Sequence, residues 1–405
     1  MVLLRWVLLA TVFSTSCLWA GDLQELVRDF DRDFASVLDE EEIPGGAWAV
    51  VQGGRVVGIG TRGHTDTTGS QPVNPSTIFR IASVSKGFAG TLAAVLAAEG
   101  EFDWSDPIVQ FKPQFPANGA SRAITVGDVV GQSTGYTPHA FDNLIEAGVS
   151  LPEIYSRFGE LHPVCQPGTC YTYQNSAFAL IEPVVESVAG TRYPETLGQR
   201  IFTPLGMNTA SVGYEAYMAN NNRAHPHVQS RGQWRTVSVK PTYYAINSAA
   251  GVNASIVDMS LWLIAKLGHR PEVLSPGVIE EVTRARVRTP RNINRRYWRD
   301  HISDAHYGLG WRIYQFGQHE LVYHGGWVSG FRADAAFSPA HDLGLVILLN
   351  AESNAISELS TRFWARAFDG LSTELVHNSD APGGDLLEGS GTPHGIAIPG
   401  EQPAQ

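Results

Sequence analysis

The arrangement of hydrophobic and polar positions near the two ends of this 405-residue chain predicts helices and strands. Residues 22–40 carry apolar side chains at helical spacing, which predicts an amphipathic helix. The segment AWAVVQGGRVVGIG then gives two β-rich runs around Gly53-Gly54, a pair typical of a two-residue hairpin turn. Near the other end, a helix from about Ser353 to Ala367 follows four strand-like runs, namely YGLGWRIYQF, ELVYHGG, FRADAAFSP and LGLVILLN.

The middle of the chain has a different pattern. Residues 85–290 look mainly helical, with apolar segments such as 176–189 and 255–268. We therefore expect strands from both ends to form one antiparallel sheet, flanked by the terminal helices, with a long helical insertion beside it. The predicted fold class is α/β plus all-α, and the crevice between the two regions is the natural place for a site.

Charge and composition exclude some partners and predict a large folded core. The formal net charge is −11, which argues against nucleic acid and anionic membrane surfaces as partners. Hydrophobic residues make up 43% of the chain and charged residues 17%, enough to bury a large core. Residues 376–405 are rich in glycine, proline and polar residues without periodicity, so we expect a disordered tail.

The N-terminal residues 1–20 predict a secretory signal peptide. A basic residue precedes an apolar run from Trp6 to Phe13, and small residues lead to a cleavage site at Ala20-Gly21. The run is shorter than the roughly 20 apolar residues of a membrane-spanning helix, so we expect none in the mature chain. A lipoprotein modified at Cys17 is the alternative, disfavoured by the polar residues before it. A periplasmic or secreted protein is expected.

Cleavage of that peptide would leave two cysteines, Cys165 and Cys170, in the sequence CQPGTC. Pro167-Gly168 between them would form a tight turn that brings the sulfur atoms together. In an exported protein a small disulfide loop is the leading interpretation. Two reduced thiols are the alternative, and metal binding by the pair alone is disfavoured.

The apolar segment IASVSKGFAGTLAAVLAA, residues 81–98, contains a single charged side chain, Lys86. Ser83 lies three residues earlier, so both side chains emerge on the same face of a helix. Burial disfavours the charged form of an amine, and the neutral amine of Lys86 can then take the proton of a serine nucleophile. The alternative is that Ser83 only caps the helix and Lys86 extends to water.

Two further motifs follow in order, Tyr173-Gln174-Asn175 before an apolar helix and His324-Gly325-Gly326 at the end of a predicted strand. With Ser83 and Lys86, they make the chain resemble the penicillin-recognising serine hydrolases. The resemblance is closest to the group of class C β-lactamases, D-alanyl-D-alanine carboxypeptidases, D-aminopeptidases and β-lactamase-fold esterases. It covers about residues 22 to 370.

The resemblance implies a β-lactamase/transpeptidase-like fold, in which helices and a large helical subdomain flank an antiparallel sheet. One hydrolase domain would then span residues 21–375. Its sheet region would comprise about residues 22–80 and 300–370, and its helical region about 85–290.

The resemblance also implies a role for each motif residue. Ser83 would be the nucleophile that forms an acyl-enzyme, and Lys86 would share in its deprotonation. Tyr173 would be the second proton-transfer group, its phenolate favoured by the nearby ammonium. Asn175 would hydrogen-bond Lys86 and the substrate amide, and the backbone N–H groups of Ser83 and Trp327 would form the oxyanion hole.

The second and third motifs each need a closer comparison with the family. Tyr171 lies beside Tyr173 and could be confused with it, but the Tyr-x-Asn spacing favours Tyr173. At the third motif, class C β-lactamases carry Lys-Thr-Gly, whereas this chain has His324 as a substrate-binding candidate that is mostly neutral at pH 7. Gly326 would let the backbone approach the substrate closely. The His-x-Gly form is more similar to the peptidase, D-aminopeptidase and esterase branches.

Histidine pairs at His225 and His227 and at His301 and His306 lack the carboxylate or cysteine set of a metal site, so no metal or other cofactor is expected. The expected function is therefore an exported serine hydrolase. It would act on β-lactams or on D-amino-acid peptide amides of cell-wall type. The alternatives are a carboxylesterase of the same fold and a penicillin-binding sensor with little turnover.

Overall fold

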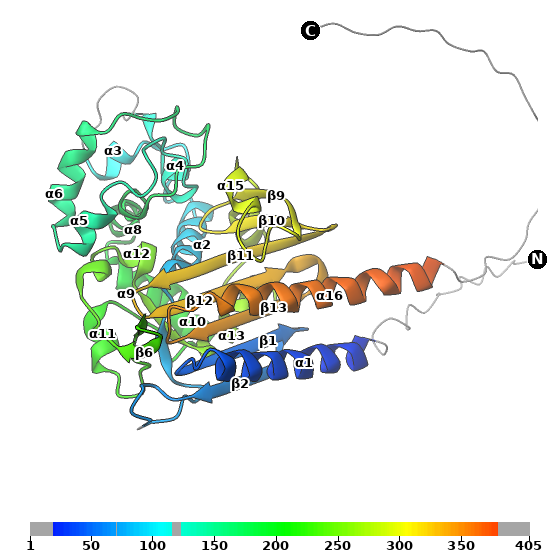
Figure 1. Cartoon of the computed structure of the whole chain (residues 1–405). Helices are drawn as coiled ribbons and strands as arrows, with labels where there is room; N and C mark the ends of the chain where they lie inside the picture. Colours follow the sequence, from blue (N-terminus) through cyan, green and yellow to red (C-terminus); the bar gives the residue numbers. More distant parts are fainter. Residues whose placement is uncertain (1–18, 70, 116–122, 380–405) are drawn as a thin grey trace, which may run out of the picture.

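The computed structural model describes residues 19–69, 71–115 and 123–379, and an eight-stranded antiparallel sheet forms the centre of this part of the chain (Figure 1). The strand order is β2-β1-β13-β12-β11-β10-β9-β8. The strands are β1 (Gly45–Gln52), β2 (Arg55–Gly63), β8 (Val287–Arg288), β9 (Ile302–Tyr307), β10 (Arg312–Phe316), β11 (His319–Val328), β12 (Phe331–Ser338) and β13 (Leu343–Leu349).

Strands from the two ends of the chain are neighbours in this sheet. Strand β1 pairs with β13, for example Gly46 with Leu349, so the predicted joining of N- and C-terminal strands is confirmed. Gly53 and Gly54 both have positive φ, 60° and 70°, as the predicted hairpin turn requires. Strands β8 and β9 were not predicted, because they are short and their polar residues hide any alternation.

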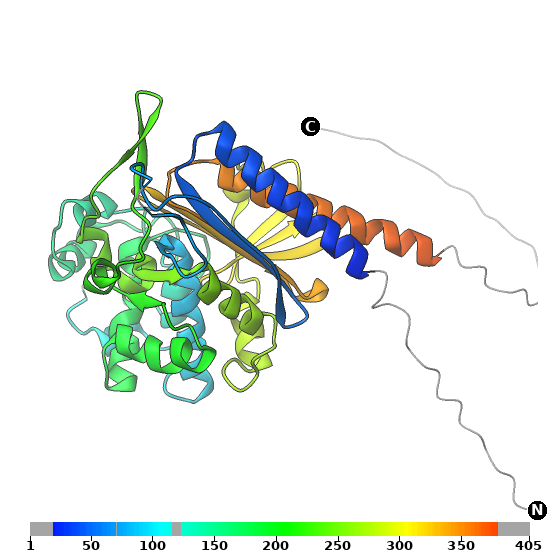
Figure 2. The same ribbon diagram turned by 90° about the horizontal axis from the view of Figure 1, so that it is seen from below.

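One face of the sheet is covered by the two terminal helices, α1 (Trp19–Glu40) and α16 (Ala355–Ser379), which lie side by side (Figures 1 and 2). Phe30 of α1 packs on Trp48 of β1 and on Phe363 of α16, with ring centroids 5.2 and 5.4 Å apart. The predicted amphipathic N-terminal helix is thus confirmed. Helix α16 is longer than predicted and continues past Ala367 into the first residues assigned to the tail.

The opposite face carries the helical region (Figure 2). Helix α13 (Ile256–Lys266) packs on β1 and β13, and its start at Ser255 is fixed by a capping box with Asp258. The remaining helices are α2 (Ser85–Ala98), α3 (Ile108–Phe111), α4 (Val126–Val130), α5 (Asp142–Glu146), α6 (Leu151–Ser156), α7 (Asn175–Phe178), α8 (Ile181–Ala189), α9 (Tyr193–Leu197), α10 (Thr203–Leu205), α11 (Tyr214–Ala219), α12 (Asn247–Ala250), α14 (Pro276–Thr283) and α15 (Pro290–Ile293).

This region is less uniformly helical than the sequence indicated. The predicted helix over 176–189 is two helices, α7 and α8. Short strands also interrupt the region, in a three-stranded sheet of order β3-β7-β4 and in a two-stranded hairpin. These strands are β3 (Ile78–Arg80), β4 (Ser211–Val212), β7 (Val252–Ser255), β5 (His227–Ser230) and β6 (Gln233–Thr236).

Close backbone packing fixes helix α2 against the sheet. A Cβ added at Gly90 would lie 2.2 Å from the carbonyl oxygen of Leu309, and one added at Gly87 would lie 2.6 Å from the ring of Trp311. Glycine at these positions therefore lets α2 approach the segment that leads into β10. Strand β10 and the N-terminal end of α2 consequently border the same space.

Some predictions concern the ends of the chain. Residues 1–18 of the predicted signal peptide and residues 380–405 of the predicted tail lie outside the described residues. Across the part that the structure describes, no helix has the length and apolar character needed to cross a membrane. The same part contains no group of three or more histidine, cysteine, aspartate or glutamate residues placed to hold a metal ion.

Candidate active site

Ser83 lies on a strained turn between β3 and α2. It belongs to a 3₁₀ turn, Ala82–Val84, and helix α2 proper begins only at Ser85. Ala82, directly before it, has φ of 50°, a left-handed conformation that non-glycine residues adopt at a cost of about 1–3 kcal/mol. The turn is held from both sides, since Ile81 N–H donates to Val252 O and Val252 N–H donates to Ser85 Oγ. This arrangement presents Ser83 to the cavity described below.

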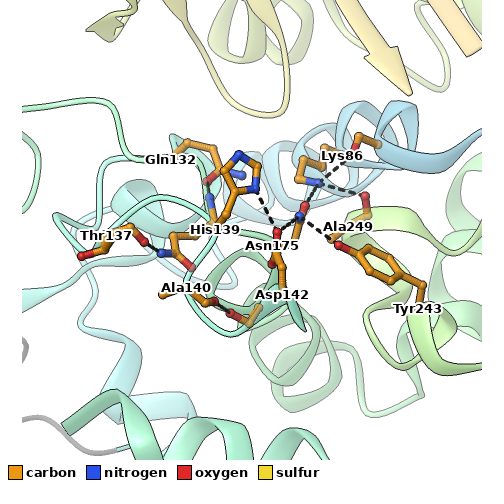
Figure 3. A network of polar contacts seen from close by, with 12 residues as sticks. Lys86, Gln132, Thr137, His139, Ala140, Asp142, Asn175, Tyr243 and Ala249 are labelled. Atoms are coloured by element: carbon orange, nitrogen blue, oxygen red, sulfur yellow. Dashed lines mark hydrogen bonds and ion pairs between the residues drawn. The ribbon is translucent and has the colours of Figure 1, made fainter. Parts of the chain in front are cut away.

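Lys86 is fully buried beside this serine, so the alternative in which it extends to water is wrong. Its Nζ lies 3.3 Å from Ser83 Oγ and donates to Asn175 Oδ1 at 2.7 Å and to Ala249 O at 3.0 Å (Figure 3). Burial holds the pKa of Lys86 well below its ordinary value. The charge of Asp142 opposes this shift and that of Arg312 adds to it.

The contacts of Lys86 are compatible with a neutral amine. A neutral –NH₂ group has two N–H donors and one lone pair. In that state the acceptor oxygens of Asn175 and Ala249 take the two N–H groups, and the lone pair faces the hydroxyl of Ser83. In the ammonium state the third N–H donates to the Ser83 oxygen instead.

Of the two neighbouring tyrosines, Tyr173 contacts the lysine. Lys86 Nζ lies 4.8 Å from the centroid of the Tyr173 ring, and Tyr173 hydrogen-bonds with Ser83. Tyr171 instead accepts a hydrogen bond from Arg312 Nη2 at 3.4 Å. Burial raises the pKa of Tyr173, more than the charge of Arg312 and the Ser83 hydrogen bond lower it. This direction disfavours the phenolate form that the resemblance implied for Tyr173.

Asn175 begins α7 and its side chain is buried between charged neighbours (Figure 3). Besides accepting from Lys86, it donates through Nδ2 to Asp142 Oδ2 at 2.8 Å and to Tyr243 OH at 3.5 Å. Asp142 also contacts His139, with Nδ1 and Oδ2 2.9 Å apart. Sequence analysis missed Asp142, because nothing in the spacing of residues 142 and 175 indicates that they meet.

The third motif lies on β11, directly against the segment that carries Ser83. A Cβ added at Gly326 would lie 2.2 Å from Ile81 O, so only glycine fits there. This contact brings β11 against the turn that carries Ser83. The Trp327 side chain is 64% exposed, and its Nε1 donates to Glu352.

His324 is fully buried and neutral. Its Nδ1 lies 3.0 Å from Gly325 O, while its Nε2 lies 3.2 Å from both Tyr307 OH and Arg312 Nη1. Because Nε2 faces N–H and O–H donors, it is an acceptor, and the ring proton belongs on Nδ1. Burial holds the pKa of His324 well below its ordinary value, and the positive charge of Arg312 adds to this shift. His324 therefore supplies no positive charge here.

Arg312 supplies the charge that His324 lacks. Its guanidinium lies 5.4 and 5.8 Å from the ring centroids of Tyr173 and Tyr307, and the residue lines the cavity. Neighbouring phenol groups raise its pKa above the ordinary value despite burial, so it stays charged. Among the described residues, no carboxylate forms an ion pair with Arg312. A lone charge in the apolar run YGLGWRIYQF was the sequence signal that could have found it.

A cavity of about 1530 Å³ opens in front of these groups. Ser83, Tyr173, Asn175, Arg312 and Trp327 line it, whereas Lys86, His324 and Gly326 lie behind its wall. One side is formed by the loop that Cys165 and Cys170 close, and these two cysteines form the predicted disulfide. The disulfide ties together the segment that leads into Tyr173.

Comparison with known proteins identifies the family. Residues 30–367 match the family model described as Beta-lactamase. The chain belongs to the β-lactamase family. A β-lactamase of Escherichia coli is 24% identical over 375 residues, which cover 85% of this chain and 93% of that protein.

Two further proteins to which the chain is similar are equally distant in sequence. The unguisins hydrolase ungD' of Aspergillus campestris is 25% identical over 344 residues, 80% of this chain but only 62% of that longer protein. A solved structure, described as the octameric penicillin-binding protein homologue from Pyrococcus abyssi, superposes with a TM-score of 0.75 at 22% identity. That match covers 85% of this chain and 77% of the other, and it confirms the predicted fold.

Proposed function

We propose that this protein is a serine hydrolase that forms an acyl-enzyme on Ser83. The observation that carries the proposal is the environment of Lys86, a fully buried amine 3.3 Å from Ser83 Oγ whose two N–H groups have acceptors elsewhere. Such an amine is a proton acceptor for the serine at neutral pH. Membership of the β-lactamase family supports the same chemistry.

In the proposed acylation step, Ser83 Oγ bonds to the substrate carbonyl carbon as its proton passes to Lys86 Nζ. The carbonyl oxygen becomes an oxyanion, stabilised by the N–H groups of Ser83 and Trp327, each worth about 3 kcal/mol in such sites. The C–N bond then breaks, and the departing nitrogen takes a proton from the neutral phenol of Tyr173. The Lys86 ammonium returns a proton to Tyr173, and water later hydrolyses the ester.

For substrates, we propose β-lactams or D-amino-acid peptide amides that carry a carboxylate on the leaving-group side. Arg312 supports this choice, because a charged guanidinium that lines the cavity without an ion-pair partner suits an anionic group. Two proteins to which the chain is similar, a β-lactamase and an unguisins hydrolase, are named as hydrolases. A simple ester without a carboxylate would leave Arg312 unused, which disfavours the carboxylesterase alternative.

We also propose that the protein is exported, with residues 21–375 as its hydrolase domain. The signal-like residues 1–20 and the disulfide between Cys165 and Cys170 support this, since disulfides persist mainly in oxidising compartments. Mass analysis of the protein from the secreting cell would test it by locating the mature N-terminus.

The experiment that tests the proposed function is an intact-mass time course of the mature protein, with Ser83→Ala as the control. It uses a penicillin, a D-alanyl-D-alanine peptide and a p-nitrophenyl ester. A transient adduct with consumption of penicillin indicates a β-lactamase, and a lasting adduct indicates a penicillin-binding sensor. Cleavage of the ester alone supports the carboxylesterase alternative. If Ser83→Ala forms the same adducts and products as the parent, the proposed function is wrong.

A further inference from the structure

The Asn175 carboxamide lies between two groups of opposite hydrogen-bonding character (Figure 3). Its oxygen faces Lys86 Nζ at 2.7 Å, and its nitrogen faces Asp142 Oδ2 at 2.8 Å. We infer that Asp142 is a positioning residue, which keeps the Asn175 oxygen turned toward Lys86 and so leaves the lysine lone pair free for Ser83. This inference rests on the proposed role of Lys86 as the proton acceptor.

The need for such a residue follows from the two protonation states of Lys86. An ammonium group is a donor only, so it orients the Asn175 oxygen toward itself without help. A neutral amine also has a lone pair, which a flipped Asn175 could occupy with its own N–H. That hydrogen bond would compete with the Ser83 hydroxyl for the same lone pair. An ionised Asp142 accepts only, so it holds the Asn175 N–H groups away from Lys86 in both states.

Asp142 is itself held in place by the motif it serves. In the preceding loop His139 and Phe141 adopt left-handed conformations, with φ of 60° and 66°. Such strain persists where surrounding contacts over-determine the backbone. Here His139 N–H donates to Tyr173 O at 2.9 Å, and Ser176 Oγ donates to Ala140 O at 3.3 Å.

Gln174, the middle residue of the second motif, adds to this attachment. Its Nε2 donates to Thr137 O, and its own N–H donates to Gln132 Oε1 at 2.6 Å. Gln174 and Ser176, on either side of Asn175, therefore hold the loop before Asp142 in place through hydrogen bonds (Figure 3). The arrangement couples the position of the carboxylate to that of the carboxamide.

The charges around Lys86 give the inference a measurable sign. The charges of Asp142 on α5 and of Arg312 on β10 shift the pKa of Lys86. A protonated Lys86 would in turn lower the pKa of His324 on β11. Asp142 raises the pKa of Lys86 against the effect of burial. Removing its charge lowers that pKa further, so neutral Lys86 persists to lower pH. The ascending limb of the pH–rate profile then moves to lower pH.

Around Asp142 itself, the titratable neighbours are His139, Tyr173 and Tyr243, besides Lys86. Glu146 lies one turn further along the same helix and also lines the cavity. Among the hydrogen bonds of the described residues, Asn175 is bonded to Asp142 and not to Glu146. Glu146→Gln is therefore a matched control, which removes one negative charge from α5 without touching the carboxamide.

The test measures the rate at which an alkyl fluorophosphonate labels Ser83 in the full mature protein, by intact mass, between pH 5 and 9. This probe reports serine reactivity whatever the natural substrate is. Asp142→Ala should slow labelling about 10- to 100-fold, as expected for loss of a hydrogen bond to a charged group. Asp142→Asn, which keeps an acceptor oxygen, should slow the labelling of Ser83 less than Asp142→Ala does. It should also move the ascending limb of the pH–rate profile to lower pH. Glu146→Gln should match the parent.

Thermal melts accompany each variant, and the nearly isosteric Asp142→Asn decides the question if Asp142→Ala unfolds. Parent-like rates and an unmoved limb in Asp142→Asn would overturn the inference, as would an equal effect of Glu146→Gln. The proposed function fails differently, because labelling of the parent itself would then be absent or unaffected by Ser83→Ala. The two failures are therefore distinguishable.

Discussion

Lys86 and Lys266 are both fully buried, and the comparison between them shows what burial alone achieves. Burial lowers the pKa of both, that of Lys266 to about 7. Lys86 Nζ meets Ser83, Asn175 and a backbone carbonyl beside the cavity. Lys266 Nζ instead donates to Thr91 Oγ1 at 3.3 Å and lies 5.6–5.8 Å from three aromatic ring centroids, those of Trp262, Trp311 and Phe337.

Both amines lie next to helix α2. Lys86 is part of this helix, and Lys266 donates to Thr91 of the same helix. Five residues separate these positions, a rotation of about 140° around an α-helix, so the amines lie on different faces of it. A perturbed pKa is thus common to both, and it does not distinguish a reactive lysine from a structural one. The Ser83 hydroxyl and the cavity beside Lys86 make that distinction.

The largest expected effect comes from replacing each lysine by methionine. Lys86→Met should slow labelling of Ser83 by an alkyl fluorophosphonate about 10²- to 10⁴-fold, the usual contribution of a general base. Lys266→Met should label at nearly the parent rate, because Lys266 contacts no group of the site. Intact-mass kinetics on both variants measure this. Equal losses in the two variants would contradict the distinction drawn between them.

A smaller effect on activity is expected when Arg312 is replaced. Arg312→Gln should lower kcat/KM about 10- to 100-fold for a D-alanyl-D-alanine peptide with a free carboxylate, because charge-assisted hydrogen bonds contribute about 1.5–3 kcal/mol. The same peptide with an amidated C-terminus lacks the anionic group, so the substitution should lower its cleavage much less. Steady-state kinetics on the peptide pair give the result. An equal loss on both peptides would mean that Arg312 does not bind the carboxylate.

The remaining prediction concerns the pH dependence of stability at Lys266. Its folded-state pKa of about 7 lies below the ordinary value of 10.5, so between these pH values the unfolded chain binds the extra proton. The free energy of unfolding then rises with pH by up to about 1.4 kcal/mol per unit in this window, and this contribution is lost as pH falls toward 7. In Lys266→Met, this increase of the free energy of unfolding with pH should be absent.

Urea unfolding of the parent and of Lys266→Met at pH 7, 8 and 9 measures the contribution. The stability of the parent relative to the variant should increase over this series, and other titrating groups cancel in the difference. A difference that does not change with pH would show that Lys266 keeps an ordinary pKa in the folded protein.

Local pattern was enough to predict the sheet core and the nucleophile pair. The hairpin at Gly53-Gly54 and the long amphipathic helix are determined by neighbours in the chain, and both are present. The Ser83–Lys86 contact is equally local, three residues along one turn of backbone. The tight CQPGTC loop likewise contains everything its disulfide needs.

The rest of the site joins positions far apart in the chain. Asn175 reaches Lys86 across 89 positions, and Ala249 O reaches it across 163. The meeting of Arg312 with His324 spans only 12 positions, and it depends on the register of the β10–β11 hairpin. The register of β10 and β11 places the Arg312 guanidinium beside His324. The site therefore contains a positive charge that the His324-Gly325-Gly326 motif itself lacks.

The sequence by itself determined the fold class, the family and which serine and lysine meet, because these depend on periodicity and short spacings. Only the tertiary structure decided the charge state of the site. Desolvation depends on every element packed around an amine or a phenol, and it lowers the pKa of Lys86 and raises that of Tyr173. The side chains that orient and balance these groups, Asp142 and Arg312, come from separate elements that only folding brings together.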